Sequence, residues 1–281
     1  MTLKIVTDSA SDVPTEIAEA LNITVIPAYI NIGADSYIDG IELSRQAFFD
    51  NLASYTSYPT TAAPAVGIFT ETYERLAREG ATEILSMHIA DTLSNFYNAA
   101  RLGAAAAQNI SISLFNTKQV SLGAGLLVIK AAEMAAKGLP LSTILSLLSR
   151  LSSQTRLFGV LDSLDSLRRS GRVNWAAFGL GTLLQIKPIL MISDGAISVL
   201  AKVRTHKRAI SQLLTYVQQL GPLERLTVVH VNAPEAAGKL KLLADAAFAE
   251  AAPLPIMAIG PAVGTHLGVG AVGFACIGTA K

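Results

Sequence analysis

Short apolar runs alternate with helical patterns along the first half of the chain. In the stretch 66–77, apolar side chains recur at helical spacing, at Phe69, Tyr73 and Leu76. Such spacing places them on one face of a helix, whereas short continuous apolar runs are typical of buried strands. The pattern predicts strands at 4–8, 22–26, 83–89 and 110–115. It also predicts a helix after Pro14 and helices at 66–77, 94–107, 123–136 and 141–151.

Strands that alternate with helices indicate a mostly parallel sheet flanked by helices. The pattern changes near residue 155. Adjacent strands follow, joined at one point by Asp194-Gly195, a strong hairpin signal. We expect strands at 157–161, 189–193, 196–203 and 226–231, and helices at 163–171, 207–220 and 233–248. The sequence therefore predicts an α/β fold with two domains, an α/β domain at 1–155 and a smaller α+β domain at 156–281.

The tail of the chain is apolar and rich in glycine. Between Glu250 and Lys281 there is no charged side chain, and one histidine, His266, stands in the middle of the segment. Prolines and glycines interrupt it, so a transmembrane helix is disfavoured. We expect two short strands, 254–259 and 272–277, joined by a glycine loop that carries His266. That side chain is either satisfied inside a core or directed at a polar group that arrives from outside.

Composition narrows the possible functions. The chain has 281 residues, of which 51% are hydrophobic and 15% charged, and its net charge is +1. This favours a large core and disfavours nucleic acid as a partner, because binding phosphates requires clustered Lys and Arg. The chain has one cysteine, Cys276, so a disulfide framework and a cysteine-based zinc site are excluded. We expect a cytoplasmic protein without stable membrane insertion, metal or cofactor.

One motif imitates a nucleotide site. Gly268, Gly270 and Gly273 match the dinucleotide fingerprint in their spacing. That fingerprint requires a helix opening on the glycines and an acidic residue about 20 positions later. Only eight residues follow Gly273, and none is acidic. The spacing alone therefore does not indicate a nucleotide site.

Hydroxyl side chains suggest a receptor for an anion. Ser94 follows an apolar strand and should open the next helix, where free backbone N–H groups attract anions. The alternative is that Ser94 merely caps its own helix, as we expect Asp12 to do for the helix after Pro14. Thr61 lies between two prolines and precedes another helix. We expect all these loops to meet at the carboxyl edge of the parallel sheet. An uncharged receptor of this kind suits a carboxylate.

No catalytic set is convincing from the sequence. The four histidines lack metal-ligand spacing, and Ser94 is not in a Gly-x-Ser-x-Gly turn. His88 is expected in the core or beside a loop. Arg172, with its neighbours Arg168 and Arg169, forms the densest basic cluster, for which a solvated helix end is the simpler interpretation. An enzyme using Ser94 and His266, such as a small hydrolase or phosphotransferase, stays open as an alternative.

Five segments in order resemble one family, the DegV family of bacterial fatty-acid-binding proteins, which includes the FakB subunits of fatty acid kinase. The segments span nearly the whole chain and are 7–12, 58–64, 93–97, 167–173 and 259–270. This sequence departs from the pattern within them, with Ala62 in place of serine, Asn95 in place of glycine and Phe96 in place of threonine. Just before the third segment, Ala90-Asp91 replaces a serine pair.

The resemblance implies a DegV-like fold with one long-chain fatty acid buried between the two domains. It assigns the fatty acid to Thr61, Ser94, Asn95 and His266. It places Arg172 near the surface used by a partner protein, an ATP-binding fatty acid kinase. The implied protein is a lipid-binding carrier rather than an enzyme, and it presents the carboxylate to the kinase for acyl-phosphate formation.

Overall fold

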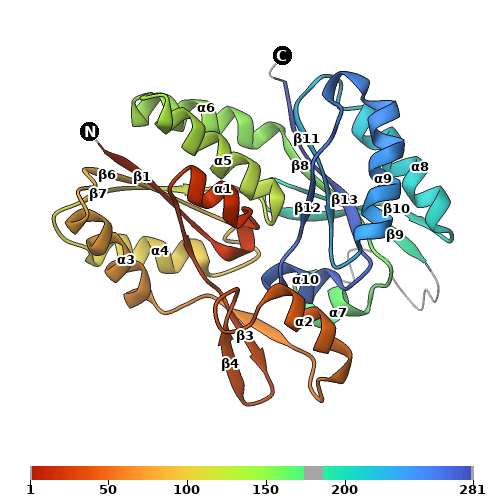
Figure 1. Ribbon diagram of the computed structural model, residues 1–281, viewed down its shortest axis with the longest axis horizontal. Coiled ribbons are helices and arrows are strands. Elements are labelled where there is room, and N and C mark those ends of the chain that lie inside the picture. Colours follow the sequence, from red (N-terminus) through yellow and green to blue (C-terminus); the bar gives the residue numbers. More distant parts are fainter. Residues whose placement is uncertain (1, 174–185, 280–281) are drawn as a thin grey trace.

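The computed structural model describes residues 2–173 and 186–279. Within these ranges the strands form three sheets, of four, six and three strands (Figure 1). The predicted fold class is confirmed: a parallel sheet flanked by helices accompanies a second sheet with its own helices.

The first sheet has the order β2-β1-β6-β7, and all its neighbours are parallel. Its strands are β1 (Leu3–Asp8), β2 (Ile23–Ile26), β6 (Glu83–His88) and β7 (Ser111–Asn116). Its helices are α1 (Thr15–Ala20), α3 (Val66–Arg78), α4 (Phe96–Ala106), α5 (Leu122–Ala136) and α6 (Leu141–Gln154). The helices α3 and α4 lie on one side, and α1 and α5 on the other (Figure 1). Because both faces are covered, β1 ends in consecutive buried residues.

The second sheet has the order β10-β9-β8-β13-β11-β12, and all its pairs are antiparallel except β11–β12. Its strands are β8 (Thr155–Val160), β9 (Lys187–Ser193), β10 (Ala196–Val203), β11 (Leu223–His230), β12 (Ile256–Ala258) and β13 (Val272–Gly278). The predicted hairpin is confirmed, because Asp194 and Gly195 join β9 to β10 with φ of 49° and 75°. Two positive φ angles match the strand twist of a hairpin.

The second sheet has a different core on each face. Its outer face packs on α8 (His206–Gln218) and α9 (Pro234–Ala247), where Phe158 and Phe274 are buried. Short 3-10 turn η3 (Ala249–Ala251) follows α9. The inner face turns toward α5 and α6, and Leu157 and Ile192 join the main core there. Side chains alternate between the two cores because successive residues of a strand point to opposite faces.

A third, small sheet was not predicted. Its order is β4-β3-β5, and its strands are β3 (Tyr29–Ile32), β4 (Asp35–Ile38) and β5 (Thr60–Ala62). Helix α2 (Arg45–Asn51) and 3-10 turn η2 (Leu52–Ser54) lie between β4 and β5. Thr61 therefore stands on an antiparallel edge strand opposite Ile30, and its predicted place on a loop of the parallel sheet is wrong. These strands are three or four residues long, too short for a clear periodic signal.

The predicted glycine loop around His266 is also wrong. Residues Pro261–Leu267 form helix α10, which begins at a proline and ends before Gly268. Gly264 brings this helix against α2, because a Cβ there would lie 2.7 Å from Cζ of Phe49. Proline suits a first helical turn, and the glycine serves close packing rather than flexibility. Tertiary contacts thus hold a helix that local propensity disfavours.

The chain passes from the first sheet and its helices to the second sheet at Thr155, where β8 begins directly after α6. The division into domains at 1–155 and 156–281 remains our proposal.

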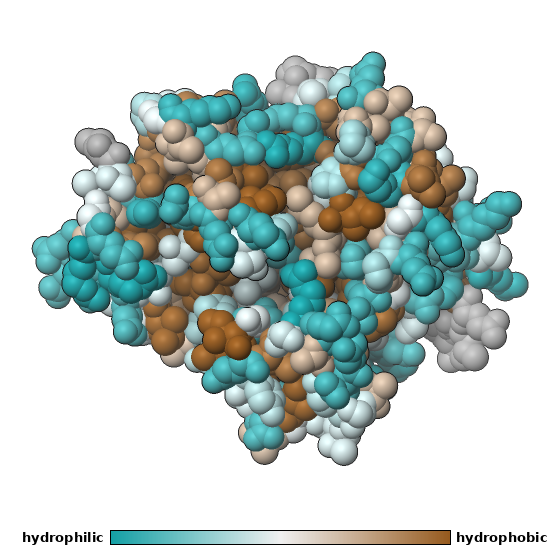
Figure 2. All heavy atoms as spheres, viewed as in Figure 1, coloured by the Kyte–Doolittle hydropathy of each residue, from teal (hydrophilic) through white to brown (hydrophobic). Residues whose placement is uncertain are grey.

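Among the described residues, no helix combines the length and apolarity needed to cross a bilayer. Ile41 and Leu242 are large apolar residues that remain 73% and 72% exposed. On the face shown in Figure 2, hydrophilic residues cover much of the outer rim, with hydrophobic ones between them.

Gly125 tests how closely α5 packs on the first sheet. A Cβ at Gly125 would lie 2.4 Å from the carbonyl oxygen of Ser11, in the 3-10 turn η1 (Ser9–Ser11) that follows β1. We expect Gly125→Ala to lower the free energy of unfolding by about 1–3 kcal/mol, because backbone atoms must shift. Urea denaturation measures this. Gly67→Ala in α3, where a Cβ meets open space, is the control and should be neutral or stabilising by up to about 1 kcal/mol. Equal effects would contradict the close packing.

Candidate functional site

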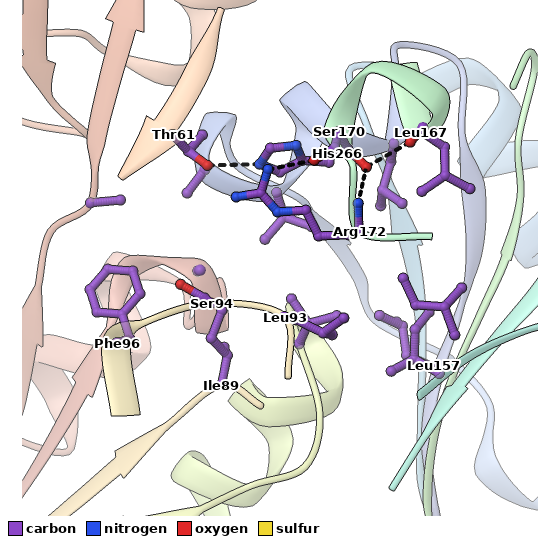
Figure 3. A pocket seen from close by; sticks show the side chains of 18 of the residues that line it. Thr61, Ile89, Leu93, Ser94, Phe96, Leu157, Leu167, Ser170, Arg172 and His266 are labelled. Atoms are coloured by element: carbon purple, nitrogen blue, oxygen red, sulfur yellow. Dashed lines mark hydrogen bonds between the residues drawn. The ribbon is translucent and has the colours of Figure 1, made fainter. Parts of the chain in front are cut away.

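A largely apolar cavity lies between the loops of the first sheet and the inner face of the second. Helices α7 (Asp165–Ser170) and α10 contribute to its wall (Figure 3). Where the structure describes it, the apolar lining consists of aliphatic side chains, alanines and one phenylalanine, among them Ile89, Leu93, Phe96, Leu157, Leu190, Ile192 and Ile197. Its polar side chains are Thr61, Ser94, Ser170, Arg172 and His266. The cavity is therefore oily, with a small polar group at one side.

Thr61 and His266 form the centre of that polar group. Oγ1 of Thr61 lies 2.7 Å from Nε2 of His266, although the residues are 205 positions apart in the sequence. Burial, together with the positive charge of Arg172, lowers the pKa of His266 to about 4. The imidazole is thus neutral near pH 7, and the pair offers a hydroxyl and a neutral ring to a ligand. The sequence predicted both residues for the site, and the structure brings them together.

Arg172 lines the cavity as well. Gly171 ends α7 in the left-handed region, with φ of 67°, and turns the chain so that Arg172 points back toward His266 (Figure 3). Its Nη1 donates to the carbonyl oxygen of Ser170 at 2.6 Å. Burial lowers the pKa of the guanidinium, which keeps some contact with solvent. We expected Arg172 outside the binding pocket, and the structure places it on the lining. Its contact with a partner protein stays a prediction.

Ser94 faces the same cavity from the first sheet. It follows β6, and its side chain points into the cavity (Figure 3). Helix α4 starts after Asn95, whose side chain makes no capping hydrogen bond. Among the described residues, the hydroxyl of Ser94 has no hydrogen-bond partner either, so it does not cap its own helix. Asn95 is exposed and is not part of the cavity lining, although the resemblance assigned it to the ligand.

Helix α10 is anchored at its start by Asp12. Oδ1 of Asp12 accepts from the backbone N–H of Gly260 at 2.7 Å, and Ser121 donates to Oδ2 at 2.6 Å. Asp12 is 4% exposed, and this burial raises its pKa to about 7 against the opposing charge of Arg45. The predicted capping role of Asp12 for α1 is wrong, because Pro14 stands at that N-cap position. The acid instead holds the helix that carries His266.

Tyr58 links three of the elements around the polar group. Its hydroxyl donates to the carbonyl oxygen of Thr265 at 2.7 Å, which joins the segment before β5 to α10. The guanidinium of Arg169, on α7, lies 4.9 Å from the centroid of the Tyr58 ring, within the range of a cation–π contact. Sequence reasoning missed this role. The one available signal was an aromatic residue directly before Pro59, at the start of the second segment that resembles the DegV family.

A second set of hydrogen-bonded polar side chains is buried between the first sheet and α3. Nδ1 of His88 contacts Oδ2 of Asp8 at 2.8 Å, and Nε2 of His88 contacts Oγ of Ser86 at 2.8 Å. Ser86 in turn contacts the hydroxyl of Tyr73 at 2.8 Å. These four residues are fully buried, so the core placement expected for His88 is confirmed. A substrate has no access to this buried Asp–His–Ser arrangement. Among the described residues, Oδ1 of Asp8 has no hydrogen-bond partner, whereas Oδ2 accepts the contact of His88.

The polar group of the cavity does not have the geometry of a serine hydrolase. A nucleophilic serine needs a base within hydrogen-bond reach. Here Nε2 of His266 is bonded to Thr61, and the described residues include no hydrogen bond between Ser94 and His266. In residues 2–173 and 186–279, no group of three or more His, Cys, Asp or Glu side chains has the arrangement of a metal site.

Known proteins resemble the chain over its whole length. The profile of a family described as "Uncharacterised protein, DegV family" matches residues 2–279. A DegV domain-containing protein from Listeria innocua is 34% identical over 275 residues, which are 96% of this chain and 96% of that protein.

Two solved structures share the architecture described above. One is a DegV family protein from Thermus thermophilus, described by its fatty acid binding, with a TM-score of 0.87 and 28% identity over 99% of this chain and 100% of its own. DegV from Bacillus subtilis, described as a fatty acid binding protein, has a TM-score of 0.88 and 28% identity, again over 99% of this chain and 100% of its own.

Asp12→Asn tests the buried anchor of α10. The folded-state pKa is raised from 3.8 to about 7, so between these values the folded protein holds a proton that the unfolded chain has lost. Stability from this group is therefore present at low pH and is lost as pH rises toward 7. Asparagine keeps the acceptor for Gly260 but does not titrate. Relative to the wild type, the variant should gain free energy of unfolding from pH 4.5 to 8, on the order of a few kcal/mol.

Urea unfolding across that pH range measures the difference between the two proteins, in which the titration of other groups cancels. Asp35→Asn, at an exposed position of β4, controls for the loss of one negative charge. A stability difference that does not change with pH would contradict the raised pKa of Asp12.

Proposed function

We propose that the chain, which belongs to the DegV family, is a carrier that binds one long-chain fatty acid in this cavity. The observation that carries the proposal is an aliphatic cavity with polar side chains gathered at one side, from Thr61, Ser94, Arg172 and His266. A fatty acid has the same division, with one carboxylate and a long apolar chain. The solved relatives described as fatty acid binding proteins support this reading.

The polar group suits a single carboxylate. Hydroxyls of Thr61 and Ser94 can donate to its oxygens, and the neutral His266 ring can share in the network through Thr61. Arg172 supplies one positive charge near His266. A polyphosphate would need several cations in contact, and the described residues of the cavity lining include one, Arg172.

The apolar wall supplies most of the binding free energy in this proposal. Each buried methylene contributes about 0.8 kcal/mol. A chain of roughly a dozen methylenes can therefore offset both the entropy of association and the desolvation of the carboxylate. No chemical step by the protein itself is required, and we propose a non-catalytic role.

We further propose that the carrier presents the carboxylate to an ATP-dependent fatty acid kinase in the cytoplasm, which converts it to an acyl phosphate. The resemblance to FakB subunits supports this role. The partial exposure of Arg172 also supports it, because the polar end of the cavity then lies within reach of a partner at the surface.

The headgroup assignment is tested by the double variant Thr61→Val and Ser94→Ala, which removes both hydroxyls with little change of volume. Hydrogen bonds to a charged group contribute about 1.5–3 kcal/mol each, so affinity for palmitate should fall at least tenfold. Calorimetric titration of delipidated protein measures the affinity, and mass spectrometry of extracted lipid shows whether a fatty acid is retained. Leu102→Ala, at an exposed site on α4, is the control. Unchanged affinity in the double variant would remove these hydroxyls from the headgroup site.

Arg172 is tested by comparing Arg172→Ala with Arg172→Lys. If its charge stabilises the bound carboxylate, the alanine variant should bind palmitate roughly tenfold more weakly and the lysine variant should retain most of the affinity. High salt should reduce the difference in palmitate affinity between these two variants, because it screens the charge. The same variants, assayed for acyl phosphate with ATP and the partner kinase, separate the two roles. Normal palmitate affinity with lost acyl phosphate in Arg172→Ala would restore the purely partner-facing role.

A further inference from the structure

Three strands of the second sheet form one wall of the cavity. In the strand register, Leu157 of β8 pairs with Ile192 of β9, and Ile192 pairs with Ile197 of β10. Directly paired residues point to the same face of a sheet. All three side chains line the cavity, so this row presents a continuous aliphatic surface. Figure 3 shows Leu157 on the opposite side of the cavity from Thr61.

The next row of the same wall contains a gap. Two residues along, Gly159 of β8 pairs with Leu190 of β9, so it faces the same side as Leu157. Leu190 and Leu167 line the cavity, as Leu157 does. Phe158 and Val160, on either side of the glycine, point to the other face and are buried under α8 and α9. Gly159 therefore adds no side chain to this face between the lining residues Leu157 and Leu190, and it is not itself one of the described lining residues.

The fold does not require a glycine at this position. Among residues 2–173 and 186–279, no heavy atom lies within 4 Å of a Cβ built on Gly159, and the φ of Gly159 is not in the left-handed region. Its neighbour across the sheet, Gly273 of β13, is different, because a Cβ there would lie 1.9 Å from the carbonyl oxygen of Phe158. Close approach of the backbone thus explains why residue 273 is a glycine, but no such contact explains the glycine at 159.

Glycine in a strand interior weakens the strand and often marks a close approach by a ligand. We propose that Gly159 is a specificity-determining position, at which the acyl chain passes directly over the backbone of β8 between Leu157 and Leu190. This inference rests on the proposed fatty acid binding and adds where the chain runs. The space left by the missing side chain is then part of the volume that the ligand fills. A side chain added at Gly159 would therefore overlap with the bound acyl chain and not with protein atoms.

Under this proposal, adding a side chain at Gly159 lowers the affinity for the ligand without lowering the stability of the protein. Gly159→Ala and Gly159→Val should leave the melting temperature of the delipidated protein unchanged or raise it, because the new side chains meet open space and valine suits a strand. Affinity for palmitate should fall in the order glycine, alanine, valine, with a loss on the order of tenfold for valine. Because the methyl groups take volume from the cavity, stearate should lose more affinity than laurate.

Calorimetric titration of delipidated full-length protein with laurate, palmitate and stearate measures these affinities, and thermal unfolding without lipid measures stability. Gly238→Ala is the matched control, since Gly238 lies in α9 on the other face of the sheet and its Cβ also meets open space. It should not change the affinity for any of the three fatty acids.

A Gly159→Val protein that binds all three fatty acids like the wild type would overturn the assigned path of the acyl chain and leave the proposed carrier function standing. A wild type that binds none of the three would overturn the carrier function and this inference together. If the valine variant does not fold, the alanine variant decides by the same comparison, and unchanged affinities there overturn the path.

Discussion

The contact between Thr61 and His266 defines the polar side of the cavity, and most of the surrounding structure serves to hold its two partners in place. Thr61 is carried by a short strand of the small sheet, and His266 by a seven-residue helix near the end of the chain. A helix of that length has little stability of its own. Its position depends on the buried Asp12 at its start, on Phe49 beside Gly264, and on Tyr58 at its end.

This arrangement explains why an acidic side chain is retained deep in an apolar interior. Burying a carboxyl group is costly unless it is hydrogen-bonded or neutral. Asp12 receives two hydrogen bonds, from Gly260 and Ser121, and its raised pKa leaves it partly protonated near neutral pH. The same side chain connects the end of the first strand, the start of α5 and the start of α10. It therefore joins both halves of the chain behind the cavity.

The histidine of the cavity is not paired with its serine. Its ring nitrogen Nε2 contacts a threonine and not the serine, and burial with the nearby Arg172 keeps the imidazole neutral. The residues Asp8, His88 and Ser86 have the order of a catalytic triad, yet they are fully buried between strands β1 and β6 and the helices α3 and α4. A few polar side chains beside an aliphatic wall are the arrangement that the proposed fatty acid carrier requires.

Local pattern determined much of this protein. Short apolar runs and helical spacing place the strands and helices of both large sheets within a few residues, and the Asp194-Gly195 turn is specified by two adjacent residues that tolerate positive φ. Ser94 and Thr61 were candidates because each stands at or before the start of a predicted helix, and His266 because it stands in an apolar segment without charged side chains. Tertiary structure alone decided that Thr61 meets His266, that α10 is a helix, that Arg172 turns back to the cavity, and that Gly159 faces open space. Each of these depends on packing between segments far apart in the chain, which no short-range pattern encodes.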